Sequence, residues 1–589
     1  MQGVFSEVMP IRKSNDTLFY LIGIIPVVWL ALLLAQSLGG GLPELLRNLT
    51  VALEQPTNII WTDKSLPTIL ICLAAYGMAV LLYRTNQGRT RDGEEHGSAA
   101  WATPASVNAQ FAQKDSIPLT QHVRLGLNTH KHRRSLNVLV IGGSGAAKTR
   151  SFVLPNILTA NTNYVITDPK SEVLLATGGY LKEQGYDVRV LNLVNLEQSD
   201  GYNPFCYLRD EKDVLKLVNN LIQSTTPKGS HESDPFWTKA ETALLQAIIL
   251  MLFQEAPEYE QNFSMVMRVL EYAEVREEDE GHVSPLDLLF ESIERRKPDS
   301  VAVRQYKVFK LAAGKTAKSI LVSAAVRLAS FTLPEIQRIT ASDDMELGKL
   351  GERKQAIFCI IPDSNDASLN FLVGMLYTQA FQELYYQADK VHQGALPVPV
   401  RLMFDEFANV ALPDGYARLQ ATMRSRNIMS TIILQNISQL KALFKDDWEG
   451  IIGNADSFVY LGGNEQSTHK YISELLGKET IDTKTSSQSK GRNGSFSQNF
   501  QQTGRELASV DELAVLDGGK CILQLRGVRP FLSEKYDITK HPNYKYLSDA
   551  DRRNTFDIEK FLSTKLKVKP EETYEVYEID AASEKVAGS

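Results

Sequence analysis

The stretch VLVIGGSGAAKTR, residues 138–150, constrains the fold of this chain more than any other feature of its sequence. An apolar strand runs into a glycine-rich turn that ends at Lys148-Thr149, close to the phosphate-binding pattern G-x-x-x-x-G-K-[ST]. Such a loop binds phosphate through backbone N–H groups that converge at the start of a helix, where no side chain blocks the approach. The pattern predicts a strand, a phosphate-binding loop and a helix in succession, although an ordinary strand-to-helix turn would also fit these residues alone.

One residue departs from this pattern, because Ala147 stands where a final glycine is expected. We expect a negative φ at Ala147, at the start of the helix, where a methyl group causes no strain. A positive φ there would cost about 1 kcal/mol or more. Lys148 would contact the β and γ phosphates of ATP, and the Thr149 hydroxyl would hold Mg²⁺. The predicted nucleotide-binding residues are Gly142, Gly143, Ser144, Gly145, Ala146, Ala147, Lys148 and Thr149.

The stretch VRLMFDEFAN, residues 400–409, supplies the second half of such a site. Carboxylates at the tip of a buried parallel strand lie on the ligand-binding edge of the sheet. Asp405 would bind Mg²⁺ through water, and Glu406 would orient and deprotonate the attacking water. An acidic pair after a strand is common and mostly structural, but together with residues 142–149 it favours an ATPase.

Two further residues follow in MRSRNIMSTIILQNISQL, residues 423–440. Gln435 ends a strand that we place beside the strand carrying Asp405, where it would sense the γ-phosphate. Arg424 would reach the nucleotide of a neighbouring subunit, as an arginine finger does in ring ATPases. Each residue alone would also fit a surface or core position. A second Gly-Lys-Thr, residues 314–316, is set aside because no strand precedes it.

Short β-branched runs alternate with helical stretches from residue 137 onward, which indicates an α/β fold with a parallel sheet covered on both faces. Between residues 210 and 330 the apolar residues recur at helical spacing instead, which predicts an all-α insertion. The polar segment 483–504 predicts a mobile loop. The predicted strands are 137–141, 164–167, 188–193, 356–361, 400–404, 430–434 and 457–461.

Two uncharged apolar runs, residues 18–35 and 66–83, are each long enough to cross a bilayer core. Arg12 and Lys13 precede the first run and arginines follow the second, which modestly favours both ends in the cytoplasm. A signal peptide for the first run, or buried soluble helices for both, are the alternatives. The predicted organisation is a transmembrane anchor (1–90), a nucleotide-binding domain in two parts (91–209 and 331–560), the insertion (210–330) and an acidic, disordered tail (561–589).

The net charge of −7 means that the surface as a whole would not attract nucleic acid, so any such contact must be local. The four cysteines form no C-x-x-C pair and suggest neither disulfides nor zinc. Residues 300–332 are basic without any acidic side chain, which fits either a solvated helix face or contact with DNA or a partner. The candidate contact residues are Arg304, Lys307, Lys310, Lys315, Lys318 and Arg327.

The two apolar runs, the loop at 142–149 and several ordered motifs together resemble the TraG/TraD-type coupling proteins of type IV secretion, especially Gram-positive members. The further motifs are ITDPKSE (166–172), YNPF (202–205), DPFWTKAE (234–241), FDEFAN (404–409), LQNISQL (434–440), NADSFVYLGGNEQST (454–468) and KYD with HP (535–542). Over about residues 15–545, this resemblance implies a RecA-like P-loop NTPase with an inserted α-domain.

The same resemblance implies a homo-hexameric ATPase of the bacterial cytoplasmic (inner) membrane with its ATPase domain in the cytoplasm. It implies that the ring brings a relaxase bound to single-stranded DNA, with other relaxosome proteins, to a type IV secretion channel and helps drive the DNA through. The family pattern marks Lys148, Thr149, Asp405, Glu406, Arg424 and Gln435 here. An FtsK-type DNA translocase and a non-hydrolysing, ATP-binding docking adaptor are the alternatives.

Overall fold

The computed structural model describes residues 16–38, 42–86, 93–226, 235–275, 282–312, 314–362, 368–410, 412–413, 415–488 and 496–565. The chain divides into two compact units, Met1–Ser98 with Thr480–Gly504, and Ala99–Glu479 with Arg505–Ser589. Arg12, Lys13 and residues 566–589 of the predicted acidic tail lie outside the described residues.

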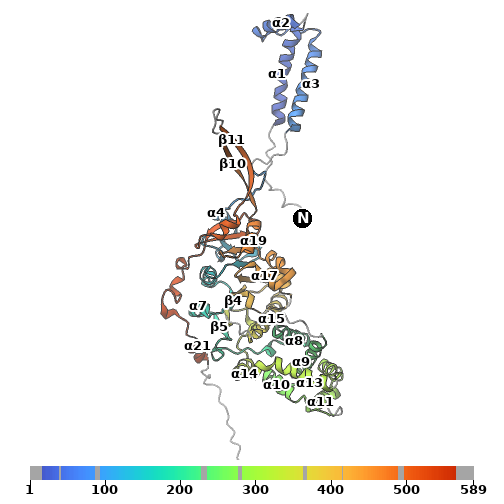
Figure 1. Ribbon diagram of the computed structural model, residues 1–589, viewed down its shortest axis with the longest axis vertical. Coiled ribbons are helices and arrows are strands. Elements are labelled where there is room, and N and C mark those ends of the chain that lie inside the picture. Colours follow the sequence, from blue (N-terminus) through green and yellow to red (C-terminus); the bar gives the residue numbers. More distant parts are fainter. Residues whose placement is uncertain are drawn as a thin grey trace, which may run out of the picture. The chain divides into compact units, whose positions relative to one another are not determined.

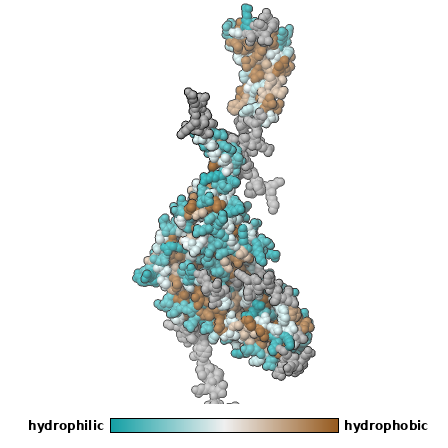
Figure 2. Space-filling view, in the orientation of Figure 1, coloured by the Kyte–Doolittle hydropathy of each residue, from teal (hydrophilic) through white to brown (hydrophobic). Residues whose placement is uncertain are grey.

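The first unit contains helices α1 (Asp16–Ser37), α2 (Leu42–Glu54) and α3 (Ser65–Asn86), with α1 and α3 side by side (Figure 1). Stretches Phe19–Ser37 and Ser65–Thr85 are apolar and long enough to span a membrane. The second contains the predicted run 66–83, and the first contains all of the predicted run 18–35 except residue 18. Large apolar side chains such as Phe19 (71% exposed) and Ile71 (69%) cover their surfaces (Figure 2). The Tyr76 hydroxyl donates to the Tyr20 carbonyl at 3.0 Å, so α1 and α3 pack against each other within this unit.

Strands β10 (Lys478–Gln488) and β11 (Phe496–Glu506) form a two-stranded sheet. The prediction of a loop over 483–504 is therefore wrong for these residues, whereas residues 489–495 lie outside the described part of the chain. Although β10 is polar, it is rich in β-branched residues such as Thr480, Ile481 and Thr483, which favour extended backbone.

A nine-stranded sheet forms the centre of the second unit, in the order β13-β12-β9-β3-β8-β7-β4-β6-β5. The seven strands from β9 to β5 are parallel, which confirms the α/β fold and all seven predicted strands, whereas β12 pairs antiparallel with β9 and β13. The strands are β3 (Val138–Ile141), β4 (Asn163–Thr167), β5 (Asp187–Asn192), β6 (Gln355–Ile360), β7 (Val400–Phe404), β8 (Ile428–Leu434), β9 (Ser457–Tyr460), β12 (Lys520–Leu525) and β13 (Phe531–Glu534).

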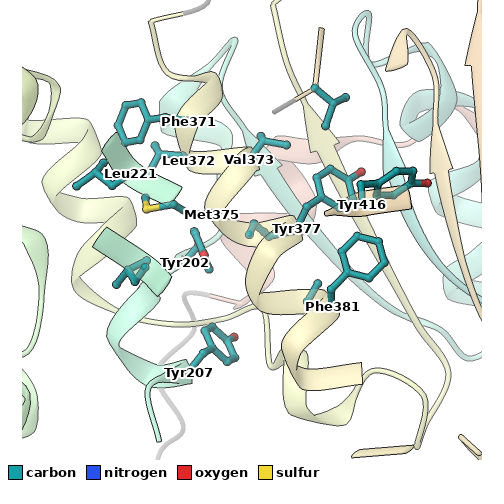
Figure 3. Packing of buried hydrophobic residues seen from close by; sticks show 14 of the residues in the cluster. Tyr202, Tyr207, Leu221, Phe371, Leu372, Val373, Met375, Tyr377, Phe381 and Tyr416 are labelled. Carbon is teal, nitrogen blue, oxygen red and sulfur yellow. The ribbon is translucent and has the colours of Figure 1, made fainter. Parts of the chain in front are cut away.

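Two hydrophobic clusters cover the two faces of this sheet. Val138 and Val140 belong to one cluster and Leu139 and Ile141 to the other, because successive strand residues point to opposite faces. One face packs against α15 (Asn370–Tyr386), which is apolar all round. Figure 3 shows this packing, with Leu221 and Met375 on one side of α15 and Tyr377 and Tyr416 on the other. The opposite face packs against the helix after β3 and against α7 (Glu172–Glu183).

Only helices and short turns lie in the described chain between β5 and β6, over the range predicted as an all-α insertion. Asp210, Asn262 and Ser284 each cap a helix by accepting a hydrogen bond from the third backbone N–H. The helices are α8 (Glu211–Thr225), α9 (Pro235–Glu255), α10 (Phe263–Glu271), α11 (Pro285–Arg296), α12 (Val301–Lys310), α13 (Gly314–Arg327) and α14 (Pro334–Ala341). Although α9 is apolar enough to span a membrane, 67% of its apolar window is buried, so it is the core helix of this region.

Shorter elements complete the second unit around this sheet. They are α4 (Pro104–Phe111), β1 (Ser116–Pro118), β2 (Arg124–Gly126), α5 (Thr129–His132), α6 (Leu154–Ile157), α16 (Tyr416–Thr422), α17 (Ile437–Phe444), α18 (Trp448–Gly453), α19 (Gln466–Leu476), α20 (Val510–Ala514) and α21 (Ile558–Lys565).

Candidate functional site

The glycine-rich loop leaves the carboxyl end of β3 and enters a π-helical turn at Thr149–Val153 that continues into α6. Gly145 has a φ of 77°, which glycine adopts without strain. The Gly143 N–H donates to the Gly462 carbonyl at 2.8 Å, and a Cβ at Gly143 would lie 3.1 Å from the Gly463 Cα. The Lys148 ammonium donates to the Gly143 carbonyl at 3.2 Å. The loop is therefore compact, and the glycines after β9 allow its close approach.

Ala147 has a φ of 61°, so the expectation of a negative φ at this residue is wrong. The left-handed conformation lets the Ala147 carbonyl accept two hydrogen bonds from Ser151, from its N–H at 2.8 Å and its hydroxyl at 2.7 Å. An alanine in this conformation costs on the order of 1–2 kcal/mol, because its Cβ crowds the following carbonyl oxygen. The helix after the loop therefore starts from a strained residue.

The structure brings Thr149 and Asp405 together, although 256 residues separate them. The Thr149 hydroxyl donates to Asp405 Oδ2 at 3.0 Å. Asp405 follows β7, which is separated from β3 by β8 alone, so the carboxyl ends of all three strands lie at one edge. Burial raises the pKa of Asp405 to about 6, against the opposing effects of the Thr149 hydrogen bond and of the Lys148 charge. A hydroxyl and a carboxylate side by side are oxygen ligands suited to Mg²⁺.

Glu406 and Gln435 also lie at this edge and contact each other. Gln435 Nε2 is 3.3 Å and 3.4 Å from the two carboxylate oxygens of Glu406. Parallel pairing of β7 with β8 confirms that the strand leading to Gln435 is beside the strand leading to Asp405. Glu406 has a φ of 56° and is half-buried, which directs its carboxylate along the strand edge and leaves it accessible.

Asp168 is a residue of this edge to which sequence reasoning assigned no role. It follows β4, the neighbour of β7, and is completely buried. Its Oδ2 accepts the Leu174 N–H at 2.8 Å, whereas its Oδ1 has no partner among the described residues. Burial raises the pKa of Asp168 to about 7, and the nearby Asp405 adds to the shift. The sequence did contain a signal for Asp168, because ITDPKSE and FDEFAN each place an acidic residue directly after a strand.

A pocket of about 640 Å³, in the range of small-ligand sites, joins Lys148, Thr149, Asp405, Glu406 and Gln435. Two non-glycine residues of its wall, Ala147 and Glu406, have positive φ, and such strain concentrates at functional sites. Gly142, Gly143 and Ala146 belong to the same loop but not to the pocket wall. The lining residues are Ser144, Gly145, Ala147, Lys148, Thr149, Arg150, Leu154, Pro169, Lys170, Glu172, Leu175, Ala176, Asp405, Glu406, Gln435, Ser548, Asp549 and Thr555.

Arg424 does not reach this pocket, because it precedes β8 and lies at the amino edge of the sheet. Ten residues separate it from Gln435, and the seven of them that form β8 alone span about 23 Å at 3.3 Å per residue. Arg424 is exposed, and its Nη1 lies 3.4 Å from the Arg133 carbonyl. Its neighbour Arg426 is instead bound by Asp389 through two hydrogen bonds of 2.8 Å. Arg424 is therefore available to a second molecule and not to its own pocket.

Four of the six predicted basic contact residues form ion pairs within the insertion. Arg327 pairs with the buried Glu241 at 2.5 Å, and its own side chain is only 14% exposed, so it is a structural residue of the α9–α13 contact. Arg304 pairs with Asp299 at 3.2 Å, Lys307 with Glu294, and Lys310 with Asp287 at 2.9 Å. Lys315 and Lys318 are exposed in the first turn of α13. The basic stretch is thus largely neutralised by acidic residues that precede it in the chain.

The fold and this pocket define a P-loop nucleotide-binding protein. The sequence profile of the family described as Type IV secretory system Conjugative DNA transfer matches residues 98–553. This chain therefore belongs to that family.

Relatives and solved structures agree with this assignment. Conjugal transfer protein TraG of Rhizobium radiobacter is 22% identical over 410 residues, 67% of this chain and 60% of that protein. TraG of Escherichia coli is 23% identical over 77% of this chain and 76% of that protein. Protein VirD4 of Rhizobium radiobacter is 21% identical over 85% of this chain and 70% of that protein. The fold matches plasmid coupling protein TrwB, solved with ADP and Mg²⁺, with a TM-score of 0.54 at 16% identity over 74% of this chain and 94% of that one.

The positive φ of Ala147 predicts that Ala147→Gly stabilises the nucleotide-binding unit by about 1 kcal/mol, because glycine removes the left-handed strain. Ala147→Val should destabilise it, since a β-branched residue tolerates positive φ even less than alanine does. Thermal unfolding of the three full-length proteins in detergent measures both changes. A glycine variant less stable than the unaltered chain would contradict the conformation described here.

The raised pKa of Asp405 predicts a pH-dependent difference in stability between the unaltered chain and Asp405→Asn. The carboxyl has a pKa of about 6 when folded and 3.8 otherwise, so its ionised form disfavours folding. Its stabilising contribution is complete below about pH 4 and is lost as pH rises through 6, and the asparagine variant gains on the order of 3 kcal/mol in relative stability by pH 8. Thermal unfolding from pH 4.5 to 8 without nucleotide or Mg²⁺ tests this, and a constant difference would refute it.

Proposed function

We propose that this protein is a membrane-anchored ATPase that couples a relaxase–DNA substrate to a type IV secretion channel during conjugation. The observation that carries the proposal is the convergence of Lys148, the Thr149–Asp405 pair and the Glu406–Gln435 pair on one pocket. Membership of the conjugative DNA transfer family and the two apolar N-terminal helices supply its context. A placement among Gram-positive members rests on the sequence motifs alone and stays a prediction.

The pocket residues fit ATP and Mg²⁺ by their chemistry. Backbone N–H groups of the loop and the Lys148 ammonium would bind the phosphates, and Thr149 and Asp405 would hold the metal. Bound Mg²⁺ neutralises negative charge that develops on the phosphates. Glu406 would orient a water molecule and accept its proton at a carboxylate oxygen, while the Gln435 amide fixes the position of that carboxylate. Gln435, one residue beyond β8, would also sense the γ-phosphate.

Arg424 supports an oligomeric enzyme in this proposal. Its position before β8 places it at the opposite end of that strand, which is about 23 Å long, from Gln435 and the edge that carries the pocket residues. In a homo-hexameric ring, Arg424 of one subunit would contact the nucleotide of the next and stabilise charge in the transition state.

The two apolar helices would anchor the chain in the bacterial cytoplasmic membrane, with the nucleotide-binding unit in the cytoplasm where ATP is available. Exposed apolar side chains along α1 and α3 support contact with lipid. The proposed partners are the lipid bilayer, a relaxase with other relaxosome proteins, single-stranded DNA and components of the secretion channel.

A docking adaptor that binds ATP with little hydrolysis is the second candidate, and the strained Ala147 favours it. An alanine in a conformation suited to glycine adds a methyl group at the pocket wall, beside the phosphate-binding lysine. The two candidates differ in whether ATP turnover depends on the pocket residues, as it would in an ATPase.

We expect DNA-stimulated ATP turnover by the full chain in detergent to fall at least 100-fold in Glu406→Gln, because a general base typically contributes 10²–10⁴-fold. Lys148→Ala should lose turnover and weaken ATP binding, because the phosphates lose their cation. Lys131→Ala, at an exposed lysine outside the pocket wall, serves as the control and should keep its rate. Equal turnover by the unaltered chain and both pocket variants would instead favour the adaptor.

The basic stretch of the insertion remains a proposed contact for DNA or a partner, centred on Lys315. We expect Lys315→Gln to lower the salt dependence of single-stranded DNA binding by a slope of about 0.7, as for one lost phosphate contact. Lys307→Gln should change it less, because Glu294 already neutralises Lys307. Binding of labelled oligonucleotide between 50 and 300 mM salt measures both slopes, and identical binding by a Lys307/Lys310/Lys315/Lys318→Gln variant would refute the contact.

A further inference from the structure

One wall of the nucleotide pocket is formed by segment 547–557, which follows β13, the last strand of the sheet in the sequence. Ser548, Asp549 and Thr555 line the pocket that contains the phosphate loop. None of these residues belongs to a phosphate-binding motif, so the sequence offered no signal for them. Their presence shows that the C-terminal segment completes the pocket.

Segment 547–557 packs directly against helix α7. Gly178 and Gly179 lie in the middle of α7, where each glycine costs about 1 kcal/mol relative to alanine. A Cβ at Gly178 would lie 2.8 Å from the Phe556 ring, and a Cβ at Gly179 would lie 3.5 Å from the Asn554 carbonyl. The Phe556 N–H also donates to the Leu175 carbonyl at 3.0 Å. A Cβ at Gly179 would make only an ordinary contact, so it is Gly178 that allows the Phe556 ring to lie directly on α7 and places Thr555 at the pocket.

Two polar contacts fix the same C-terminal region to the phosphate loop. The Lys535 ammonium, directly after β13, donates to the Ala146 carbonyl at 3.0 Å. The Arg150 guanidinium, next to Thr149, forms an ion pair with the Asp549 carboxylate. Asp549 is thus held at the pocket wall, and Arg150 offsets the negative charge that this carboxylate brings to a pocket for a polyanion.

The pocket wall combines polar and apolar side chains. Lys148, Thr149 and Asp405 lie at the sheet edge, and Lys170 and Glu172 add one charge of each sign. Leu154 and Ala176, about one helical turn beyond Thr149 and Glu172, are buried apolar side chains. Asp549 is the acidic side chain that the C-terminal segment adds to this wall. An apolar surface beside a carboxylate acceptor is what a nucleoside requires, since the base packs on apolar groups and ribose hydroxyls donate hydrogen bonds to a carboxylate.

We propose that segment 547–557 forms the nucleoside-binding wall of the pocket and that Asp549, positioned by Arg150, accepts hydrogen bonds from the ribose hydroxyls of the bound nucleotide. This inference rests on the proposed function, because it assigns the nucleoside end of the same ATP site. It makes Asp549 a specificity-determining residue, and Arg150 and Gly178 positioning residues.

The test compares ligands that share phosphates but differ in the sugar. Affinities for Mg-ATP, Mg-2′,3′-dideoxy-ATP and inorganic Mg-tripolyphosphate are measured on the full chain in detergent, for the unaltered protein, Asp549→Ala and Lys148→Ala. Asp549→Ala should weaken ATP binding about tenfold, as expected for a lost hydrogen bond to a charged acceptor. It should leave dideoxy-ATP and tripolyphosphate affinities unchanged. Because the comparison is made between ligands on one protein, partial loss of folding does not imitate the result.

The controls separate this proposal from the ATPase proposal. Asp557→Ala, an exposed carboxylate of the same segment that is not in the pocket wall, should bind all three ligands as the unaltered chain does. Equal weakening of all three ligands by Asp549→Ala would show that Asp549 acts only through the phosphate loop and would overturn the nucleoside assignment, as would no weakening at all. Failure of the proposed function is a different result, in which the unaltered chain binds ATP no better than Lys148→Ala.

Discussion

Parallel pairing of the four neighbouring strands β3, β8, β7 and β4 is the constraint on which the whole site depends. Each of these strands leads to at least one polar group beyond its carboxyl end, because parallel strands finish at the same edge of a sheet. The Thr149–Asp405 hydrogen bond depends on this strand order, which leaves only β8 between β3 and β7. A sheet with the same strands in sequence order would keep the Gln435–Glu406 contact between β8 and β7, but it would separate Thr149 from Asp405.

The strand edge that holds the site residues also contains strained backbone and buried acidic side chains. Ala147, Ser171 and Glu406 have left-handed backbone, and burial raises the pKa values of Asp168 and Asp405. The helix beneath this edge offsets that cost, since the Tyr377 hydroxyl of α15 lies 2.7 Å from the Thr167 hydroxyl and its ring packs on Phe404. Both contacts are made by the residues immediately before the two buried aspartates. A packed apolar helix thus supports a strained, acidic strand edge.

Contacts between distant parts of the chain determine both the charge on the surface of the second unit and the residues that form its pocket. The basic stretch of the insertion is neutralised by Asp287, Glu294 and Glu241, which lie on other helices. The C-terminal segment returns across the sheet to α7 and reaches the phosphate loop through Arg150. The proposed ATPase therefore combines a pocket formed by distant parts of the chain with an insertion whose electrostatic surface is weaker than its local sequence indicates.

By itself, the sequence determined the features that depend on local pattern. Seven strands, the apolar helices α1 and α3, the phosphate loop and the acidic pair after β7 follow from hydropathy, β-branching and residue spacing, which act over a few neighbouring residues. Only the tertiary structure decided the φ of Ala147, the extended conformation of the polar strands β10 and β11, the burial of Asp168 at the strand edge, the place of Asp549 in the pocket wall, and the burial of Arg327 against Glu241. These depend on which distant segments pack together, and packing partners far apart along the chain leave no periodic signal in either segment.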